Sequence, residues 1–548
     1  MSGIGRREFL IGFAASGGAC AIDGCRTRSG RGREKVRDYF CTWETQRALW
    51  KGKTCERDNM NEEVLFGNDG WADLFPDARE GLVMVLDDGW DVPYGAVNKG
   101  DGYAVFGALT PNAARFPSLT GTTVSKLRQL RRRLEDRGWG GLGIWVAAQA
   151  CGETHENQFP KERLIEDLKR KLSESAEAGV AYWKVDWGVH GSDIEYRQWT
   201  SELARSYAPD LIVDHSCGFD NAVNGHAYPY DPPWTPGASL PKIDGETGRM
   251  IGTPGFERVR RQYTAMMSYS DSFRTYDTLP PMTSATALER AVFELQCADA
   301  TKSPCTINVE DEPLIGAALG LGIGVMRAAV WPDPKVSEPD PKQRRIAEIT
   351  RCVRWRKYAP VFGSDRGCPV LFSAETGEET WYFKPGSTWW SAAFGKTLRQ
   401  VAPSVVSRGL PLPEVRCGNG ERPLVCASRS PDTGSLAVAS LPMLTVAKGR
   451  HTPRADVFLD AALSRSTPLG VFGDITSVTV KDGAPSARVF ARDLAGGADV
   501  DITDRCRRSM NMLTIPGEAL SAIGRSANPS EDCSSPGVVV SLRELQVR

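Results

Sequence analysis

The sequence predicts an α/β protein in which a (β/α)8 barrel of the TIM type is followed by a C-terminal antiparallel β-sandwich, in one or two domains. Between Asp38 and Gly363, short apolar or β-branched segments alternate with longer amphipathic ones, which is typical of βα units around a parallel sheet. After Tyr358 the pattern changes to short alternating segments separated by Gly, Pro and Asp, which is typical of all-β domains. The length of 548 residues also favours a large domain with a smaller companion.

The predicted barrel strands are short and apolar, and the segments between them have the spacing of surface helices. Leu127, Leu130 and Leu134 recur at helical spacing among arginines, which predicts a helix with one buried face. Helices are expected over 124–137, 161–178, 192–207 and 342–358. The expected strands are Tyr39–Trp43, Gly81–Leu86, Gly141–Val146, Ala181–Val185, Leu211–His215, Ser272–Thr275 and Pro304–Val309, with the eighth within Leu321–Ala329.

The chain is expected to have three parts. An export signal with its linker occupies 1–32, the barrel 33–364, and the β-rich domain or domains 365–548. In the last part, strands are expected over 379–383, 388–394 and 435–441; in the barrel, long Pro-rich loops are expected over 228–241 and 332–341.

The N-terminus resembles a twin-arginine export signal. The Arg6-Arg7 pair is followed by a short apolar stretch and by the small residues of 14–19. We therefore expect an exported protein that is periplasmic, attached to the cell surface or secreted. A lipid anchor on Cys20 or Cys25 is an alternative, although the triplets before both are poor matches. No other segment has the 18 or so apolar residues that span a bilayer.

Composition excludes several classes of partner and cofactor. The 67 Lys+Arg and 68 Asp+Glu give a net charge of -1, so no basic field would concentrate nucleic acid or an anionic membrane. The 14 cysteines include no CxxC pair, and the five histidines show no HExxH spacing, so no metal is predicted and disulfides are optional. The 15 tryptophans are a weak indication of carbohydrate, because indole faces stack on sugar rings.

Acidic and aromatic side chains gather where the predicted strands end. The carboxyl ends of barrel strands converge on one mouth, so these groups are expected to face a single pocket. Taken singly, each is equally well explained as a helix cap or a core residue. The group comprises Asp87, Asp88, Trp90, Trp145, Asp186, Trp187, Asp214, His215 and Cys217.

These segments resemble the α-galactosidase and α-N-acetylgalactosaminidase clan of retaining α-glycosidases. The similarity is in order and spacing, and it runs as far as about Val309. The matching segments are VMVLDDGWD from Val83, GALTPNAARFPS from Gly107, KLRQLRRRLEDRGWGGLGIWV from Lys126, AYWKVDWG from Ala181, VDHSCGF from Val213 and SFRTYD from Ser272.

The resemblance implies a role for each matched residue. Asp186 would be the nucleophile and Asp277 the acid/base, while Asp87 and Asp88 would bind the 4- and 6-hydroxyls of the sugar. The other substrate-binding candidates are Lys184, Cys217, Arg274 and the aromatic residues Trp43 and Trp145, either of which could stack on the sugar.

The residue types agree with this chemistry. Retaining hydrolysis needs an ionised carboxylate and a protonated one about 5–5.5 Å apart. Lys184 projects to the same side of its strand as Asp186, where its ammonium would favour the ionised nucleophile and donate to a sugar hydroxyl. The alternative is a purely structural Lys-Asp pair.

The sequence departs from the family at several positions. Asp277 lies three residues after Arg274, whereas the family commonly has four, so Asp271 is a reserve candidate for the acid/base. Gly218 and Phe219 follow Cys217, which leaves recognition at carbon 2 open. Asp311, in NVEDEP, is a weaker candidate for the site.

We therefore expect hydrolysis of a terminal α-galactoside with no cofactor, and an oligosaccharide or glycoconjugate as substrate. The alternatives are α-N-acetylgalactosaminide or β-L-arabinopyranoside hydrolysis, and a catalytically silent carbohydrate-binding protein, which the shortened Arg274 to Asp277 interval favours. A Ser-His-Asp hydrolase is disfavoured because no GxSxG elbow is present. Neither nucleic acid nor a membrane span is expected, and the oligomeric state is not readable.

Overall fold

The barrel strands of the computed structural model run parallel and close on themselves in the order β1-β10-β9-β8-β5-β4-β3-β2. The strands are β1 (Asp38–Cys41), β2 (Leu82–Leu86), β3 (Leu142–Val146), β4 (Tyr182–Val185), β5 (Ile212–His215), β8 (Ser272–Arg274), β9 (Thr306–Glu310) and β10 (Gly322–Val325). The structure describes residues 38–48, 55–98, 100–152, 159–191, 193–216, 242–243, 250–251, 256–274, 284–326, 341–382, 397–418, 421–525 and 534–544. The predicted barrel is confirmed, and its eighth strand is β10.

The barrel strands are apolar along their whole length because both of their faces are covered. Every residue of β2, Leu82–Leu86, is buried, since one face points into the barrel and the other packs under helices. Side chains alternate between these directions. The inward positions include the apolar cluster around Tyr39, Val83 and Tyr182, and the ionisable residues described below.

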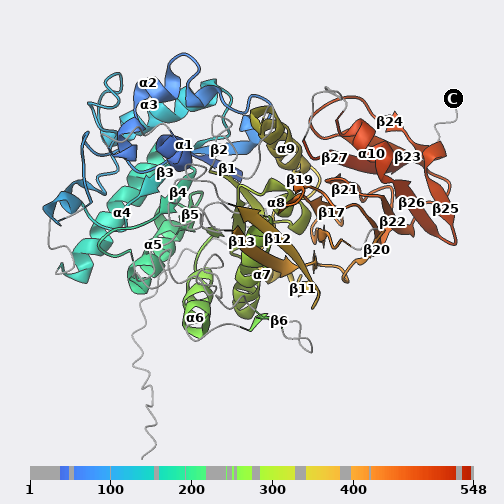
Figure 1. Cartoon of the computed structure of the whole chain (residues 1–548). Coiled ribbons are helices and arrows are strands. Elements are labelled where there is room, and N and C mark those ends of the chain that lie inside the picture. Colours follow the sequence, from blue (N-terminus) through green and yellow to red (C-terminus); the bar gives the residue numbers. More distant parts are fainter. Residues whose placement is uncertain are drawn as a thin grey trace, which may run out of the picture. The chain divides into compact units, whose positions relative to one another are not determined.

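Helices follow most strands and cover the outside of the barrel (Figure 1). In α3, Leu127, Leu130 and Leu134 are buried, as their spacing predicts. α4 ends at Ala178 and is capped by Gly179, whose φ of 77° is the left-handed conformation that glycine adopts most easily. The main helices are α3 (Thr123–Asp136), α4 (Lys161–Ala178), α5 (Ile194–Tyr207), α6 (Phe256–Met267), α7 (Ser284–Thr301), α8 (Pro313–Leu319) and α9 (Pro341–Trp355).

Helix α7 is buried on nearly all sides instead of on one face. The hairpin of β12 (Thr376–Tyr382) and β13 (Thr397–Pro403) lies against the side of α7 that would otherwise meet solvent (Figure 1). Glu379 on β12 also accepts a hydrogen bond at 2.7 Å from the backbone N–H of Ala285. The low amphipathicity of α7 therefore reflects a position between the barrel and this hairpin.

Most of the remaining C-terminal strands form two facing sheets around a second apolar core, while β18 (Met443–Thr445) and β19 (Gly449–His451) form a separate two-stranded sheet. Most pairs are antiparallel, but β14–β16, β17–β21 and β20–β22 are parallel, so the sheets are mixed. One sheet contains β11 (Val370–Phe372), β14 (Val405–Arg408), β16 (Leu424–Arg429), β17 (Leu436–Leu441), β21 (Leu469–Phe472), β27 (Gly537–Arg543), β23 (Arg488–Asp493) and β24 (Val500–Asp501). The other contains β15 (Glu414–Cys417), β20 (Ala455–Leu463), β22 (Ser477–Asp482), β26 (Met512–Pro516) and β25 (Arg507–Ser509).

The barrel helices and the C-terminal sheets are joined by a buried ion pair. Arg351 on α9 donates to Asp493 on β23 through Nε at 3.0 Å and Nη2 at 3.2 Å. Trp355, also on α9, packs edge-on against Phe472, with ring centroids 6.0 Å apart. The barrel and the C-terminal sheets therefore belong to one compact unit, which covers residues 35–548.

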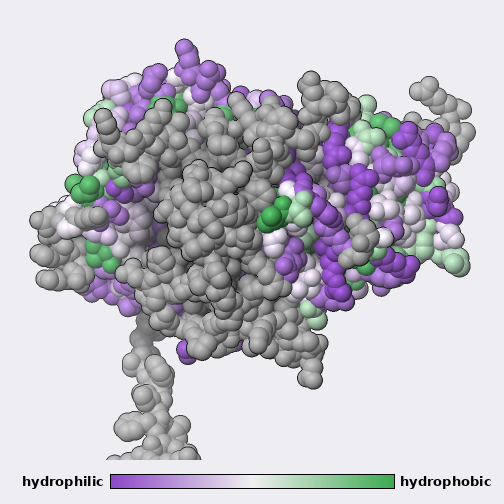
Figure 2. Space-filling view, viewed as in Figure 1, coloured by the Kyte–Doolittle hydropathy of each residue, from purple (hydrophilic) through white to green (hydrophobic). Residues whose placement is uncertain are grey.

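The visible surface of the C-terminal strands is largely hydrophilic, with scattered apolar spots (Figure 2). Among the helices of the described ranges, none combines the length and apolarity that crossing a bilayer requires. The expected strand over 388–394, the Pro-rich loop at 228–241 and the N-terminal signal lie outside the described residues. The same holds for the Pro-rich loop at 332–341 except for its last residue, Pro341, which begins α9.

Candidate active site

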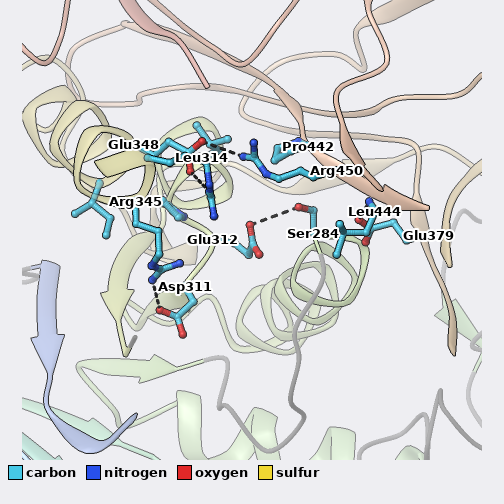
Figure 3. Close-up of a pocket in the computed structure, with 13 residues that line it drawn as sticks. Ser284, Asp311, Glu312, Leu314, Arg345, Glu348, Glu379, Pro442, Leu444 and Arg450 are labelled. Atoms are coloured by element: carbon cyan, nitrogen blue, oxygen red, sulfur yellow. Dashed lines mark hydrogen bonds and ion pairs between the residues drawn. The ribbon is translucent and has the colours of Figure 1, made fainter. Parts of the chain in front are cut away.

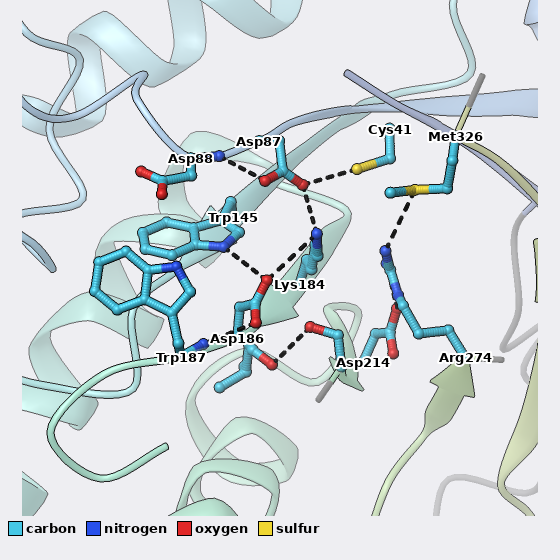
Figure 4. A network of polar contacts seen from close by, with 12 residues as sticks. Cys41, Asp87, Asp88, Trp145, Lys184, Asp186, Trp187, Asp214, Arg274 and Met326 are labelled. Carbon is cyan, nitrogen blue, oxygen red and sulfur yellow. Dashed lines mark hydrogen bonds and ion pairs between the residues drawn. The ribbon is translucent and has the colours of Figure 1, made fainter. Parts of the chain in front are cut away.

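Four of the predicted site residues meet at the carboxyl ends of β2, β3 and β4 (Figure 4). Asp87 directly follows β2, Trp145 lies on β3, Lys184 lies on β4, and Asp186 directly follows β4. Alternation along each strand points all four side chains to the inside of the barrel, although they are distant in sequence. The strand ends therefore bring two carboxylates, an ammonium and an indole together.

Asp87 is held by three donors. Its Oδ2 accepts from Cys41 Sγ at 2.8 Å and lies 2.6 Å from Lys184 Nζ, while its Oδ1 accepts from the backbone N–H of Asp88 at 2.8 Å. The hydroxyl of Thr42 accepts from the backbone N–H of Asp87 at 2.9 Å. These contacts fix the carboxylate in one orientation.

Lys184 bridges the two carboxylates. Its Nζ is 2.6 Å from Asp87 Oδ2 and 3.4 Å from Asp186 Oδ2, and its side chain is 1% exposed. Burial alone would lower the pKa of Lys184, but the charge of Asp87, assisted by Cys41 and Asp186, raises that pKa well above its usual value. The ammonium is therefore charged at every pH at which the protein would work.

Asp186 is enclosed by donors and is 3% exposed. Its Oδ2 accepts from Trp145 Nε1 at 3.1 Å, and its Oδ1 accepts from the backbone N–H of Trp187 at 2.8 Å. Arg197 on α5 donates to its backbone carbonyl at 2.7 Å. Side chain and main chain are thus both fixed, which is a requirement for a carboxylate that must meet one atom of a substrate.

Asp88 has a different partner, Arg57 on the short helix η1 (Glu56–Asn59). Arg57 donates to both of its oxygens, from Nε at 3.2 Å and from Nη2 at 2.8 Å. Burial raises the pKa of Asp88 to about 6, against the lowering effect of Arg57 and together with the charges of Asp87 and Asp186. The charge of Asp88 therefore changes near neutral pH.

Aromatic rings line one side of the carboxylates. The Trp187 ring lies 5.0 Å from that of Trp145 and 4.8 Å from that of Phe106, centroid to centroid. Trp145 is fully buried, so its indole N–H is its contact with the site, whereas Trp187 is partly exposed. Trp43 begins α1 (Trp43–Ala48) just beyond β1 and packs on the apolar cluster inside the barrel.

Arg274, the last residue of β8, is buried and binds two carboxylates. Its Nε and Nη2 donate to Asp214 Oδ2 at 2.7 and 2.5 Å, and its Nη1 donates to Glu310 Oε1 at 3.2 Å. Tyr182 donates to the same Asp214 oxygen at 2.5 Å, and Tyr39 donates to Glu310 at 2.8 Å. The structure thus gives Arg274 interior partners, and its contact with a substrate stays a prediction.

Asp271 and His215 do not join the cluster. Asp271 precedes β8, at the opposite end of the strand from the mouth, and its Oδ2 accepts from the backbone N–H of Val213 at 3.2 Å. His215 points outward to α5, where Ser201 Oγ is 2.8 Å from its Nε2. Burial, with the nearby charge of Arg197, lowers the pKa of His215 well below its usual value, so it is neutral. Asp277 and Cys217 lie outside the described residues.

A separate polar pocket lies where α8 and α9 approach the C-terminal strands, and it shares no lining residue with the Lys184 cluster (Figure 3). It contains Asp311, whose φ of 59° is unusual for a residue with a side chain. Arg345 donates to Asp311 Oδ1 at 2.9 Å, and the backbone N–H of Met326 donates to the same oxygen at 3.1 Å. Asp311 therefore has a role in holding the end of β9 against α9.

Two residues of the cluster, Arg57 and Cys41, were not singled out from the sequence. Cys41 lies at an inward position of β1, two residues after Tyr39, and alternation could have identified it. Arg57 lies on a connecting segment, where no periodicity marks it. Within the described ranges, no group of three or more His, Cys, Asp or Glu side chains is arranged to hold a metal ion.

Neither a protein-family model nor a curated protein matches the sequence. Among solved structures, the chain is similar to α-galactosidase I from Mortierella vinacea, with 11% identity, a TM-score of 0.37, and 93% of this chain and 98% of that chain covered. It is also similar to a GH27 β-L-arabinopyranosidase from Geobacillus stearothermophilus, with 11% identity, a TM-score of 0.40, and 94% of this chain and 98% of that chain covered. A third similar structure is an α-galactosidase from Saccharomyces cerevisiae with raffinose, with 10% identity, a TM-score of 0.36, and 92% of this chain and 97% of that chain covered.

Proposed function

We propose that this protein is a retaining glycoside hydrolase that removes a terminal α-galactoside-type sugar through a covalent intermediate on Asp186. The contact series from Asp87 through Lys184 to Asp186, at the mouth of the barrel, carries this proposal. These residues belong to the LDDGW and KVD segments, which resemble the retaining α-glycosidases most strongly.

The proposed reaction has two steps. In the first, a carboxylate oxygen of Asp186 bonds to the anomeric carbon, the bond to the leaving oxygen breaks, and that oxygen takes a proton from Asp277. In the second, water attacks the anomeric carbon and gives a proton to Asp277, and the ester bond to Asp186 breaks. The configuration at the anomeric carbon is inverted twice and so retained.

The proposed sugar contacts come from the same cluster. Asp87 and Asp88 would accept hydrogen bonds from sugar hydroxyls, and Lys184 would donate one, because each is held rigidly by its neighbours. The other predicted contacts are Trp43, Trp145, Cys217 and Arg274. Asp87 Oδ2 already accepts from two donors, so its Oδ1 is the better placed acceptor.

A panel of nitrophenyl glycosides tests the sugar and the nucleophile together. The wild-type protein is expected to hydrolyse the α-D-galactopyranoside fastest, with proton NMR showing the α-anomer as the first product. α-N-acetylgalactosaminide and β-L-arabinopyranoside are the alternatives in the same panel. Asp186→Asn should lose at least about 1,000-fold in kcat, because an amide cannot form the ester intermediate. If Asp186→Asn kept most of the activity, the nucleophile assignment would be wrong.

The same panel, combined with a binding measurement, also distinguishes an enzyme from a carbohydrate-binding protein without activity. Galactose binding by calorimetry without turnover of any activated glycoside would favour the catalytically silent alternative. Asp493→Asn serves as a matched control, because Asp493 is an equally buried carboxylate that pairs with Arg351 outside the Lys184 cluster. Its effect is expected on folding stability more than on the chemical step.

We also propose that the protein is exported by a twin-arginine pathway, on the basis of the Arg6-Arg7 pair. Replacing both arginines by lysine should leave the precursor in the cytoplasm. Fractionation of cells with an antibody to the barrel measures this directly. Unchanged export of the Lys-Lys variant would contradict the proposal.

A further inference from the structure

Arg57 reaches the cluster from outside the strand ends. It lies on η1, which follows α1 in the connection between β1 and β2, and its guanidinium binds both oxygens of Asp88 at 2.8 and 3.2 Å. This is the planar two-point arrangement that arginine forms with a carboxylate and that lysine cannot form. Arg57 is 4% exposed, so water screens the pair little.

The remaining surroundings hold the guanidinium in one plane. Its Nη1 donates to the backbone carbonyl of Ala96 at 2.9 Å. Its central carbon lies 5.0 Å from the ring centroid of Phe106 and 6.0 Å from that of Trp187, within the range of cation–π attraction. The arginine is thus fixed by contacts beyond its partner, and it can orient Asp88 as well as neutralise it.

The backbone at Arg57 is equally constrained. Its carbonyl accepts from Arg115 Nη1 at 2.9 Å, and a Cβ placed on Gly89 would lie only 2.4 Å from that carbonyl oxygen. Gly89 directly follows Asp88 and has a φ of 121°, a conformation available to glycine. The turn after β2 therefore has a shape that admits η1 against it.

We infer that Arg57 is a positioning residue that fixes the Asp88 carboxylate for a hydroxyl of the bound sugar and thereby sets substrate affinity. The inference rests on the proposed function, because it assigns Asp88 to sugar binding. It goes further by assigning a role to a residue on a connecting segment that none of the matched motifs contains.

Electrostatics supports the geometry. Among the largest charge effects on the pKa of Asp88, that of Arg57 lowers the pKa and so favours the ionised form, whereas those of Asp87 and Asp186 raise it. Asp91 also repels Asp88, because each negative charge raises the pKa of the other carboxyl. Without Arg57 the pKa of Asp88 would rise above about 6. On acidification, Asp88 would then be protonated and lose its charge at a higher pH than in the wild type.

The competing explanation is that Arg57 only holds two loops together. In that case its removal would lower the melting temperature without a selective effect on substrate affinity or on pH dependence. Arg137 provides a matched control, because it pairs with Asp73 at 2.8 Å on the surface and donates to a backbone carbonyl, yet lies outside the cluster.

The test measures kcat and KM against pH for the wild type, Arg57→Met, Arg57→Lys, Asp88→Asn, the Arg57→Met/Asp88→Asn double variant, and Arg137→Met. Arg57→Met should raise KM by about 30-fold or more, as expected when one partner of a buried charge pair is removed. The decrease of kcat/KM on the acid side of its pH profile, called the acid limb below, should occur at a higher pH in Arg57→Met than in the wild type. Arg57→Lys should recover part of the affinity, and the double variant should be no worse than the worse single one.

Three results would overturn the inference. They are an unchanged KM and acid limb in a folded Arg57→Met protein, additive losses in the double variant, or equal effects from Arg137→Met. If the wild type hydrolyses no glycoside, the proposed function fails separately. The same variants are then compared by calorimetry with galactose, where Arg57→Met must weaken binding and raise its dependence on pH. Absence of binding to the wild type would overturn the inference as well.

Discussion

The ammonium of Lys184 lies 2.6 Å from Oδ2 of Asp87, with both side chains almost completely buried inside the barrel. The same ammonium is 3.4 Å from Asp186, so it connects a carboxylate proposed to bind a sugar hydroxyl with the one proposed to attack the anomeric carbon. One positive charge between two negative ones offsets the repulsion between the two carboxylates at close range.

The first prediction concerns this lysine. Lys184→Met should lower kcat/KM by at least about 100-fold, because the carboxylates lose the charge that stabilises them together. It should also lower the free energy of unfolding by roughly 3–5 kcal/mol, the usual cost of removing one partner of a buried ion pair. Chemical denaturation and steady-state kinetics measure the two effects.

Lys171 is a suitable control for the loss of a buried lysine. Its Nζ is 2.6 Å from Asp167 and donates to the carbonyl of Gln149 at 2.8 Å, and its side chain is as buried as that of Lys184. Lys171→Met should lose stability and keep a near-normal kcat/KM. Equal kinetic losses in the two variants would mean that Lys184 acts only through folding.

The second prediction concerns Asp91, a buried carboxyl outside the proposed sugar contacts. Its Oδ2 accepts from the backbone N–H of Leu109 at 3.2 Å, while its Oδ1 has no hydrogen-bond partner among the described residues. Burial raises the pKa of Asp91 to about 7. Between about pH 4 and 7 the folded state therefore keeps a proton on Asp91 that the unfolded state releases. The contribution of the protonated Asp91 carboxyl to stability is complete below about pH 4 and is lost as the pH rises through 7.

Asp91→Asn removes that pH dependence. The variant should be more stable than the wild type at pH 8, by an amount on the order of a few kcal/mol, and should match it below about pH 4. Melting temperatures measured across pH 4 to 8 test this. A variant that is less stable at pH 8 would show that the Asp91 charge is favourable in the folded protein.

The third prediction concerns the turn at Gly89. A methyl group there would meet the carbonyl oxygen of Arg57 at 2.4 Å, on a backbone with a φ of 121°. Gly89→Ala should cost roughly 2 kcal/mol or more and raise KM, because the strain is relieved only by moving Asp88 or η1.

Gly95→Ala is the control, since Gly95 also has a positive φ, of 73°, but has no atom within 4 Å of an added Cβ. It should cost about 1 kcal/mol and leave KM near the wild-type value. A larger KM effect at Gly95 than at Gly89 would contradict the role given to the turn. Both variants are compared by thermal melting and by initial rates.

The barrel could be predicted because its strands carry their signal locally. A segment such as LVMVL at Leu82–Leu86 is apolar throughout, and strands of that kind occur where both faces are covered. Asp87 and Asp186 could be placed at one mouth for the same reason, since each follows such a strand. Burial of α7 on nearly all sides was not predictable, because it depends on a hairpin about a hundred residues further along the chain.

The partners of the site residues were harder to predict than their positions. Arg274 was expected to meet substrate, but Asp214 and Glu310 on neighbouring strands are also at inward positions and compete for its guanidinium. Arg57 is paired to Asp88 across 31 positions of chain, through a segment without periodicity. Such pairings depend on how loops pack, and a single sequence shows this poorly.

The most direct test of the central claim is covalent labelling with a mechanism-based fluoro-sugar of the α-galactosyl type, followed by peptide mapping. We predict one label per chain, attached to Asp186, with turnover lost in proportion to labelling. A stable label on any other carboxylate, or a failure of the fluoro-sugar to label a protein that is hydrolysing glycosides, would contradict the claim.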